Sequence, residues 1–254
     1  MLIALMIALA LPRVLPVNGV GHGRAEGTDG TSRPTEGAAT QTHAGSLTDF
    51  VSFVVNDVQR TWRREFARAG RPYQDATLVL FDGATRSGCG LASSSTGPFY
   101  CPVDQRVYLD AGFFRDLATR FGAPGDFAQA YVIAHELGHH VQNLLGIQSQ
   151  VAAAEAADPS QANALSVRLE LQADCFAGVW AHSTSVRGLL EPGDLQEGLT
   201  AAAAVGDDRI EAATTGHINP ETFTHGTSEQ RATWFRNGFA GGTLNSCDTF
   251  SATV

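Results

Sequence analysis

The chain has 254 residues, of which 43% are hydrophobic and 17% charged, a composition typical of a globular protein with one sizeable core. Its formal net charge is −9, and its densest basic group is four arginines between Arg60 and Arg68, which fit one solvated face of a predicted helix. The sequence therefore lacks the basic surface of a nucleic-acid-binding protein, and we expect no nucleic-acid partner.

The N-terminal residues differ in composition from the rest. Residues 2–11 are apolar, but a helix that crosses a bilayer needs about 20 such residues. They fit the apolar part of a secretory signal without its basic start, or the end of a truncated membrane anchor; an apolar N-terminus without a targeting role is the alternative. Residues 17–45 are rich in Gly, Thr, Ser and Ala and predict a flexible linker.

The chain thus divides into three parts. Residues 1–16 form a signal-like or truncated membrane-anchor segment, residues 17–45 a linker, and residues 46–254 one folded domain. We expect an exported protein, secreted or located at the cell envelope, for which the N-terminus is a candidate membrane tether.

The first half of the domain combines one long helix with short strands. A helix is predicted from Ser46 because apolar residues recur at three- and four-residue spacings as far as Phe66. Thr77–Phe81 and Arg106–Asp110 read as strands, residues 99–100 as a short third, and a short helix follows. A small sheet followed by helices is typical of an α+β fold.

Four cysteines also favour export. Cys89 and Cys101 flank a Gly/Ser-rich turn at 90–98, where a disulfide would close a loop, and this pairing leaves Cys175 with Cys247. Four cysteines allow three connectivities, and four buried free thiols are a further alternative.

A buried helix is predicted for residues 127–145. Asp126 is a candidate N-cap, with Gln129 completing a capping box, and Gly146 suits the position after the last turn. The segment is apolar nearly all round, so any polar side chain within it needs a partner.

This helix carries the sequence His-Glu-Leu-Gly-His at 135–139. His135 and His139 are four residues apart, on one helical face, where both imidazoles can reach one zinc ion. Glu136 can lie beside a zinc-bound water, as the general base does in zinc peptidases.

A second predicted helix carries candidates for the third zinc ligand and for the acceptor that orients a ligand histidine. Asp158 and Pro159 indicate its start, and it runs toward Trp180. Glu170 and Asp174 share one face, so Glu170 is a candidate third ligand and Asp174 a candidate acceptor for the free ring N–H of a ligand histidine.

Six separated segments match, in order, the motifs of one protein family: Gly97–Pro102, Val107–Asp110, His135–His140, Leu169–Gly178, Phe223–Arg231 and Cys247–Phe250. Over roughly residues 46–250 the chain resembles the bacterial neutral zinc metallopeptidases, and Glu-x-x-Ala-Asp at 170–174 resembles the second motif of the glutamate-ligand zincins. The resemblance implies a zincin-like fold with His135, His139 and Glu170 as zinc ligands, Glu136 as base, and Asp174 supporting a histidine ligand.

Two further helices are predicted near Asp194–Val205 and over Thr227–Gly238, the latter with Gln230 completing a capping box. His225 precedes the last helix, whose N-terminus favours the neutral imidazole. His225 is therefore a candidate for stabilising the oxyanion or delivering a proton, or else a structural histidine.

The other polar candidates favour structural roles. His217 can reach the site from the same loop, but His140 faces another side of its helix and fits a packed or hydrogen-bonded histidine. Tyr131 is expected in the core, and Asp207 and Asp208 are expected in a capping or solvated turn rather than in a calcium site. Surface or linker positions are expected for His22, His43 and His182.

These residues favour the hypothesis that the protein is a zinc-dependent peptidase, which uses one catalytic zinc ion to hydrolyse peptides or proteins. An exposed edge of the small sheet, for which we choose Val107–Asp110, would align the substrate by strand addition. A cell-envelope binding protein with a zincin fold and a non-peptidase metallohydrolase are the rivals, and the intact Glu136 argues against the first.

Overall fold

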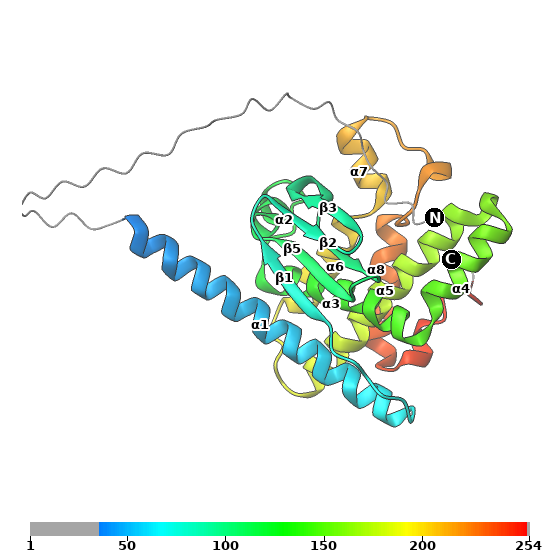
Figure 1. The fold of residues 1–254 in the computed structure, drawn as a ribbon, viewed down its shortest axis with the longest axis horizontal. Coiled ribbons are helices and arrows are strands. Elements are labelled where there is room, and N and C mark those ends of the chain that lie inside the picture. Colours follow the sequence, from blue (N-terminus) through cyan, green and yellow to red (C-terminus); the bar gives the residue numbers. More distant parts are fainter. Residues whose placement is uncertain (1–35, 253–254) are drawn as a thin grey trace, which may run out of the picture.

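In the computed structural model, which describes residues 36–252, a small sheet lies beside a larger group of helices (Figure 1). The strands are β1 (Thr77–Phe81), β2 (Ala84–Ser87), β3 (Gly90–Ser93), β4 (Phe99–Cys101) and β5 (Arg106–Asp110). The helices are α1 (Glu36–Arg68), α2 (Phe113–Thr119), α3 (Asp126–Leu145), α4 (Ile147–Ala157), α5 (Ala162–Val186), α6 (Asp194–Ala204), α7 (Asp207–Thr214) and α8 (Ser228–Gly241). The predicted α+β class is confirmed.

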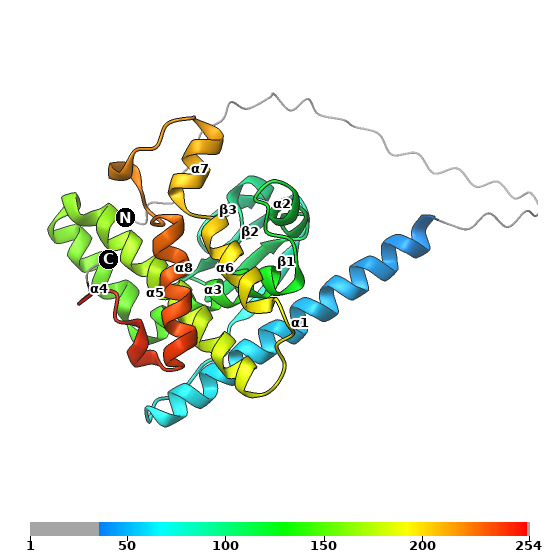
Figure 2. The ribbon, with the colours of Figure 1, turned by 180° about the vertical axis from the view of Figure 1, so that it is seen from behind.

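Helix α1 begins at Glu36, before the start predicted at Ser46. Pro34 is the last proline before Pro72, so no residue between them obliges the helix to stop. The helix runs along one side of the molecule, and its first part extends past the other elements (Figures 1 and 2). Residues 36–45 of the predicted linker are therefore helical, while the 1–16 segment and residues 17–35 lie outside the described residues.

The three-stranded sheet has the order β1–β5–β4. Strand β1 is parallel to β5, with Thr77 opposite Arg106, and β4 is antiparallel to β5, with Tyr100 opposite Val107. Because β5 is paired on both sides, the prediction that Val107–Asp110 is an exposed edge is wrong. Strands β2 and β3 form a separate hairpin, where β3 replaces the first part of the predicted turn at 90–98.

Helices α3 and α5 pack closely at the centre of the fold. A Cβ atom on Gly138 would lie 3.1 Å from the carbonyl oxygen of Ala173, so a glycine at this position lets the two backbones approach. Helix α5 also crosses α8, where a Cβ on Gly238 would lie 1.9 Å from the carbonyl oxygen of Cys175. These contacts fix α5 between the helix that carries the histidines and the last helix of the chain.

The N-terminus of α3 is capped by another helix. Gly125, not Asp126, is the N-cap residue, and it makes no side-chain cap; instead the Phe127 N–H donates to Glu197 Oε2 of α6, 3.2 Å away. The predicted capping box at Asp126 is therefore wrong, because a carboxylate distant in sequence supplies the acceptor. Gly146 does end the helix in the left-handed conformation, as predicted.

Two of the helices have no counterpart among the predicted elements. Helix α4 has a single buried residue, Val151, and α7 likewise buries only Asp207. Helices with so little buried surface lack the apolar stripe by which a helix is recognised in sequence.

Both disulfides have the predicted pairing. Cys89–Cys101 joins the β2–β3 turn to β4, and Cys175–Cys247 joins α5 to the 3-10 turn η4 (Leu244–Cys247). Disulfides are typical of proteins that fold in an oxidising compartment, which agrees with an extracellular or periplasmic location. None of the helices in the described part of the chain has the length and apolar character needed to cross a membrane.

Candidate metal centre and active site

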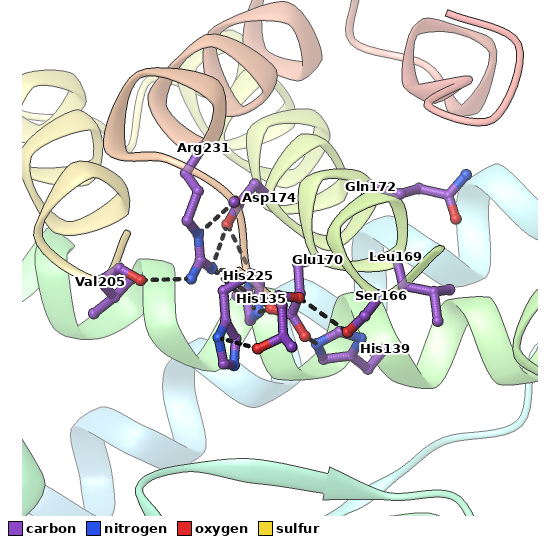
Figure 3. A network of polar contacts seen from close by, with 12 residues as sticks. His135, His139, Ser166, Leu169, Glu170, Gln172, Asp174, Val205, His225 and Arg231 are labelled. Atoms are coloured by element: carbon purple, nitrogen blue, oxygen red, sulfur yellow. Dashed lines mark hydrogen bonds and ion pairs between the residues drawn. The ribbon is translucent and has the colours of Figure 1, made fainter. Parts of the chain in front are cut away.

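Three side chains from two helices converge where α3 packs on α5. His135 Nε2 lies 3.2 Å from Glu170 Oε2, and His139 Nε2 lies 3.4 Å from Glu170 Oε1 (Figure 3). One ligand atom from each residue lies within 4.8 Å of the others. Two imidazole nitrogens and one carboxylate are the protein ligands of many catalytic zinc sites.

The protonation of His135 shows why this donor set fits a cation. Its Nδ1 lies 2.8 Å from Asp174 Oδ1, and an ionised carboxylate only accepts, so Nδ1 carries the hydrogen. In the neutral ring, Nε2 then presents a lone pair to the carboxylate of Glu170. Two electron-rich atoms face each other favourably only when a positive charge lies between them, and a zinc ion fits that requirement.

The surrounding charges also favour a cation. Burial opposes the charged form of His135, but Asp174 and Glu170 outweigh burial and raise the pKa of the imidazole to about 10. Burial likewise opposes ionisation of Glu170, yet His139 and His135 hold the pKa of its carboxyl well below the usual value. The site thus favours positive charge at the histidine nitrogens, which protons or a divalent metal ion would supply.

Asp174 is held by an arginine from α8. The Arg231 side chain makes a two-point ion pair with it, from Nε to Oδ2 at 2.8 Å and from Nη2 to Oδ1 at 3.0 Å (Figure 3). The Tyr131 hydroxyl also donates to Asp174 Oδ1, and Arg231 Nη1 donates to the carbonyl of Val205, 3.0 Å away. Burial raises the pKa of Asp174, but the charges of Arg231 and His135 reverse this shift and keep it ionised.

Arg231 was not assigned a role from the sequence, although it lies in a segment that carried the family resemblance. It is 4% exposed and shares one face of α8 with the buried Trp234, Phe235 and Gly238. An arginine at spacings of three, four and seven from buried residues is a signal for a buried charge that needs a partner.

Glu136 is buried next to His135, and its carboxylate accepts no hydrogen bond from the described residues. It is 8% exposed, and among residues 36–252 no donor reaches its carboxylate. Burial raises the pKa of Glu136 above its usual value, although the neighbouring histidines oppose the shift. A buried carboxylate with a raised pKa and free lone pairs can accept a proton from a reacting group.

His225 approaches the same site from the loop before α8. Figure 3 shows its imidazole beside His135 and Glu170, and its Nδ1 lies 3.0 Å from Asp207 Oδ1. Burial lowers the pKa of His225, but the hydrogen bond to Asp207 and the charge of Glu170 raise it overall. The adjacent carboxylate thus acts against the helix N-terminus, which favours the neutral imidazole.

Asp207 organises this loop. Its Oδ2 accepts the backbone N–H groups of Thr224, His225 and Gly226 at 2.7, 2.6 and 3.1 Å. The predicted capping role is confirmed, but the capped segment is the distant loop that carries His225. The sequence contained no signal for that pairing.

The other histidines lie elsewhere. His217 is exposed and hydrogen-bonded through its backbone to Thr215. His140 is buried, with its ring 3.0 Å from the Tyr100 hydroxyl and 2.6 Å from the carbonyl of Gln74, as expected of a structural histidine.

His182 is partly buried, whereas a surface position was expected. Its Nδ1 forms a hydrogen bond with the carbonyl of Phe239 in α8, 2.7 Å away. The side chains of His22 and His43 lie outside the described residues.

The fold and site together define an α+β protein in which His135, His139 and Glu170, on two packed helices, form a group that could bind a metal ion. The chain belongs to the family described as "Putative neutral zinc metallopeptidase", whose sequence model matches residues 1–250. It is 50% identical over 206 residues to the uncharacterized protein YpfJ of Escherichia coli (strain K12), covering 81% of this chain and 72% of YpfJ. It is also 50% identical over 210 residues to the uncharacterized protein Rv2575 of Mycobacterium tuberculosis (strain ATCC 25618 / H37Rv), covering 78% and 68%. No solved structure matches the chain.

Proposed function

We propose that this protein is a zinc-dependent peptidase in which His135, His139 and Glu170 hold one zinc ion. The observation that carries the proposal is that these three side chains converge beside Glu136, a buried carboxylate with no hydrogen-bond donor of its own in the described chain. Zinc, when bound in such a site, lowers the pKa of water to about 7 and polarises a carbonyl group.

Each residue of the site then has a separate role in peptide hydrolysis. Glu136 accepts a proton from the attacking water and passes it to the leaving amine, for which its raised pKa is suited. His225 in its protonated form, which Asp207 and Glu170 favour, donates a hydrogen bond to the oxygen on which negative charge develops. Asp174, fixed by Arg231, orients His135.

The substrate is a peptide or protein segment that can extend the sheet. Strand β5 is central, so the free edges are those of β1 and β4. Strand β4 contacts α3, where the Tyr100 hydroxyl accepts from Asn143 at 3.0 Å. We therefore assign strand addition to β4, next to the metal-bearing helix.

One experiment separates peptidase activity from the two rival functions. The purified protein is loaded with zinc, and cleavage of a peptide library is followed by mass spectrometry, with and without a chelator. We expect about one zinc per chain and cleavage that the chelator abolishes and added zinc restores. Zinc binding without cleavage would favour a binding protein, and hydrolysis of small esters alone would favour another hydrolase; both contradict the proposal.

A further inference from the structure

The two histidines of the site are supported by groups of different kinds. His135 faces the charged pair of Asp174 and Arg231, whereas His139 Nδ1 lies 2.8 Å from the amide oxygen of Gln142. His139 is therefore oriented by a neutral side chain on its own helix, one turn further on. Gln142 is fully buried, so its amide needs partners of its own.

Those partners continue as a chain of amides across α5. Gln142 Nε2 donates to the carbonyl of Leu169 at 2.7 Å and to Gln172 Oε1 at 3.1 Å. Gln172 Nε2 donates in turn to the carbonyl of Cys247, 3.0 Å away. The amide chain, defined as Gln142 and Gln172, thus connects His139 with the C-terminal tail, defined as residues 247–252.

The backbone carbonyls of Cys247 and Leu169 determine which group donates in each hydrogen bond of the amide chain. The carbonyls of Cys247 and Leu169 only accept, so both glutamines turn their NH₂ groups toward them. Each amide oxygen then points back, and Gln142 Oε1 can only accept a hydrogen from His139 Nδ1. His139 consequently keeps its Nε2 lone pair on the side of Glu170, which is the tautomer that binds a metal.

The anchor of the amide chain is covalently bound to the helix that supplies Glu170. Cys247 is 1% exposed and is disulfide-bonded to Cys175 of α5. Beyond it, the Thr249 hydroxyl donates to the carbonyl of Arg168 at 2.7 Å. The tail is thus held on α5 on both sides of the carbonyl that orients Gln172.

We propose that the C-terminal tail, anchored by the Cys175–Cys247 disulfide, sets the zinc affinity of the site through Gln172 and Gln142. The inference rests on the zinc site of the proposed function and deepens it: Gln142 and Gln172 are positioning residues for His139. Removing the partner of a ligand histidine typically weakens metal binding about 10- to 100-fold. Loss of the hydrogen bond from Gln172 to the Cys247 carbonyl removes one neutral hydrogen bond that is more distant from His139. This loss should weaken zinc binding about 2- to 12-fold.

The test measures zinc affinity by competition with a chromophoric chelator on the full chain, without any peptide substrate. Gln142→Leu should weaken zinc binding about 10- to 100-fold. Gln148→Leu is the matched control, because the Gln148 amide donates to the backbone carbonyl of His139, 3.1 Å away, and not to the ring. The visible spectrum of the cobalt-substituted protein should change in Gln142→Leu and remain that of wild type in Gln148→Leu.

The role of the disulfide is tested against the other disulfide of the same chain. Replacing both Cys175 and Cys247 by Ser should weaken zinc binding about 2- to 12-fold, whereas replacing Cys89 and Cys101 should leave it unchanged. Gln172→Leu with both disulfides intact should weaken binding to the same degree, and it keeps the test valid if the serine variant does not fold. In a Gln172→Leu background, loss of Cys175–Cys247 should have no further effect.

The outcomes distinguish this inference from the proposed function. A protein that binds no zinc at all would overturn the proposed function and the inference together. Zinc binding that is unchanged in folded Gln142→Leu and Gln172→Leu variants would overturn the inference alone. Equal weakening on removal of either disulfide would also overturn it, because the effect would then be one of general stability.

Discussion

Arg231 and Asp174 form a two-point ion pair in which both residues are almost completely buried, at 4% and 0% exposure. The pair joins α8 to α5, and Asp174 in turn fixes the ring of His135. A buried charge is tolerated when it is paired and hydrogen-bonded, and is costly when its partner is removed.

Arg231→Leu should therefore destabilise the metal-free protein by about 3–5 kcal/mol, because it removes the arginine partner of the buried Asp174 carboxylate and leaves it only His135 and Tyr131. Urea unfolding in the presence of a chelator measures the effect. Arg236→Leu, on the exposed face of the same helix, is the control and should change the free energy of unfolding by no more than about 0.5 kcal/mol. Adding Asp174→Asn to Arg231→Leu should recover part of the lost stability, and a further loss would show that the charge left on Asp174 is not the cause.

The crossing of α5 and α8 depends on the absence of a side chain at Gly238. A Cβ atom there would overlap the carbonyl oxygen of Cys175, so Gly238→Ala must push the two backbones apart. We expect a loss of about 1–3 kcal/mol or more in the free energy of unfolding. Asn237→Ala, one residue earlier and exposed, should leave it within about 0.5 kcal/mol. Equal stability of the two variants would contradict the close packing of α5 on α8.

A pH dependence of stability follows from Asp57 of α1. Its carboxylate, 3% exposed, accepts from Trp180 Nε1 at 2.9 Å and from Arg187 Nη2 at 2.7 Å. Burial raises the pKa of Asp57, but the hydrogen bonds from Arg187 and Trp180 lower it overall. A carboxyl with a lowered pKa in the folded state stabilises the fold above its unfolded pKa near 3.8, and this contribution is lost as the pH falls through the folded value.

Asp57→Asn should accordingly reduce the free energy of unfolding by about 1.5–3 kcal/mol at neutral pH, the weight of hydrogen bonds to a charged group. The difference from wild type should narrow as the pH falls below about 4. Chemical unfolding of both metal-free proteins from pH 7 to pH 3 measures it, with the exposed Asp49→Asn as a control on the same helix. A difference that widens toward acid pH would refute the assignment.

Local periodicity predicted much of this molecule. The spacing of His135 and His139, and that of Glu170 and Asp174, placed each pair on one helical face, and the structure brings the two faces together. The apolar pattern of α1 from Val51 onward is likewise buried as expected. These features depend on the three- and four-residue repeat of a helix, which is present in the sequence itself.

Relations between distant segments were not predictable in this way. The cap that Glu197 provides to α3 and the contact of Asp207 with the His225 loop depend on how helices pack. The central position of β5 is set by a crossover from β1, which no local pattern reveals. Arg231 lay in a recognised motif, but its partner Asp174 is 57 positions away in the sequence.

The most direct test of the peptidase proposal is the Glu136→Gln variant. Glutamine keeps the size of the side chain but removes the basic carboxylate, so zinc content and fold should match the wild type. Peptide hydrolysis by the zinc-loaded variant should fall about 10²- to 10⁴-fold, the typical contribution of a general base. Hydrolysis at the wild-type rate by a variant with full zinc content would contradict the role of Glu136 as general base and with it the proposed mechanism of peptide hydrolysis.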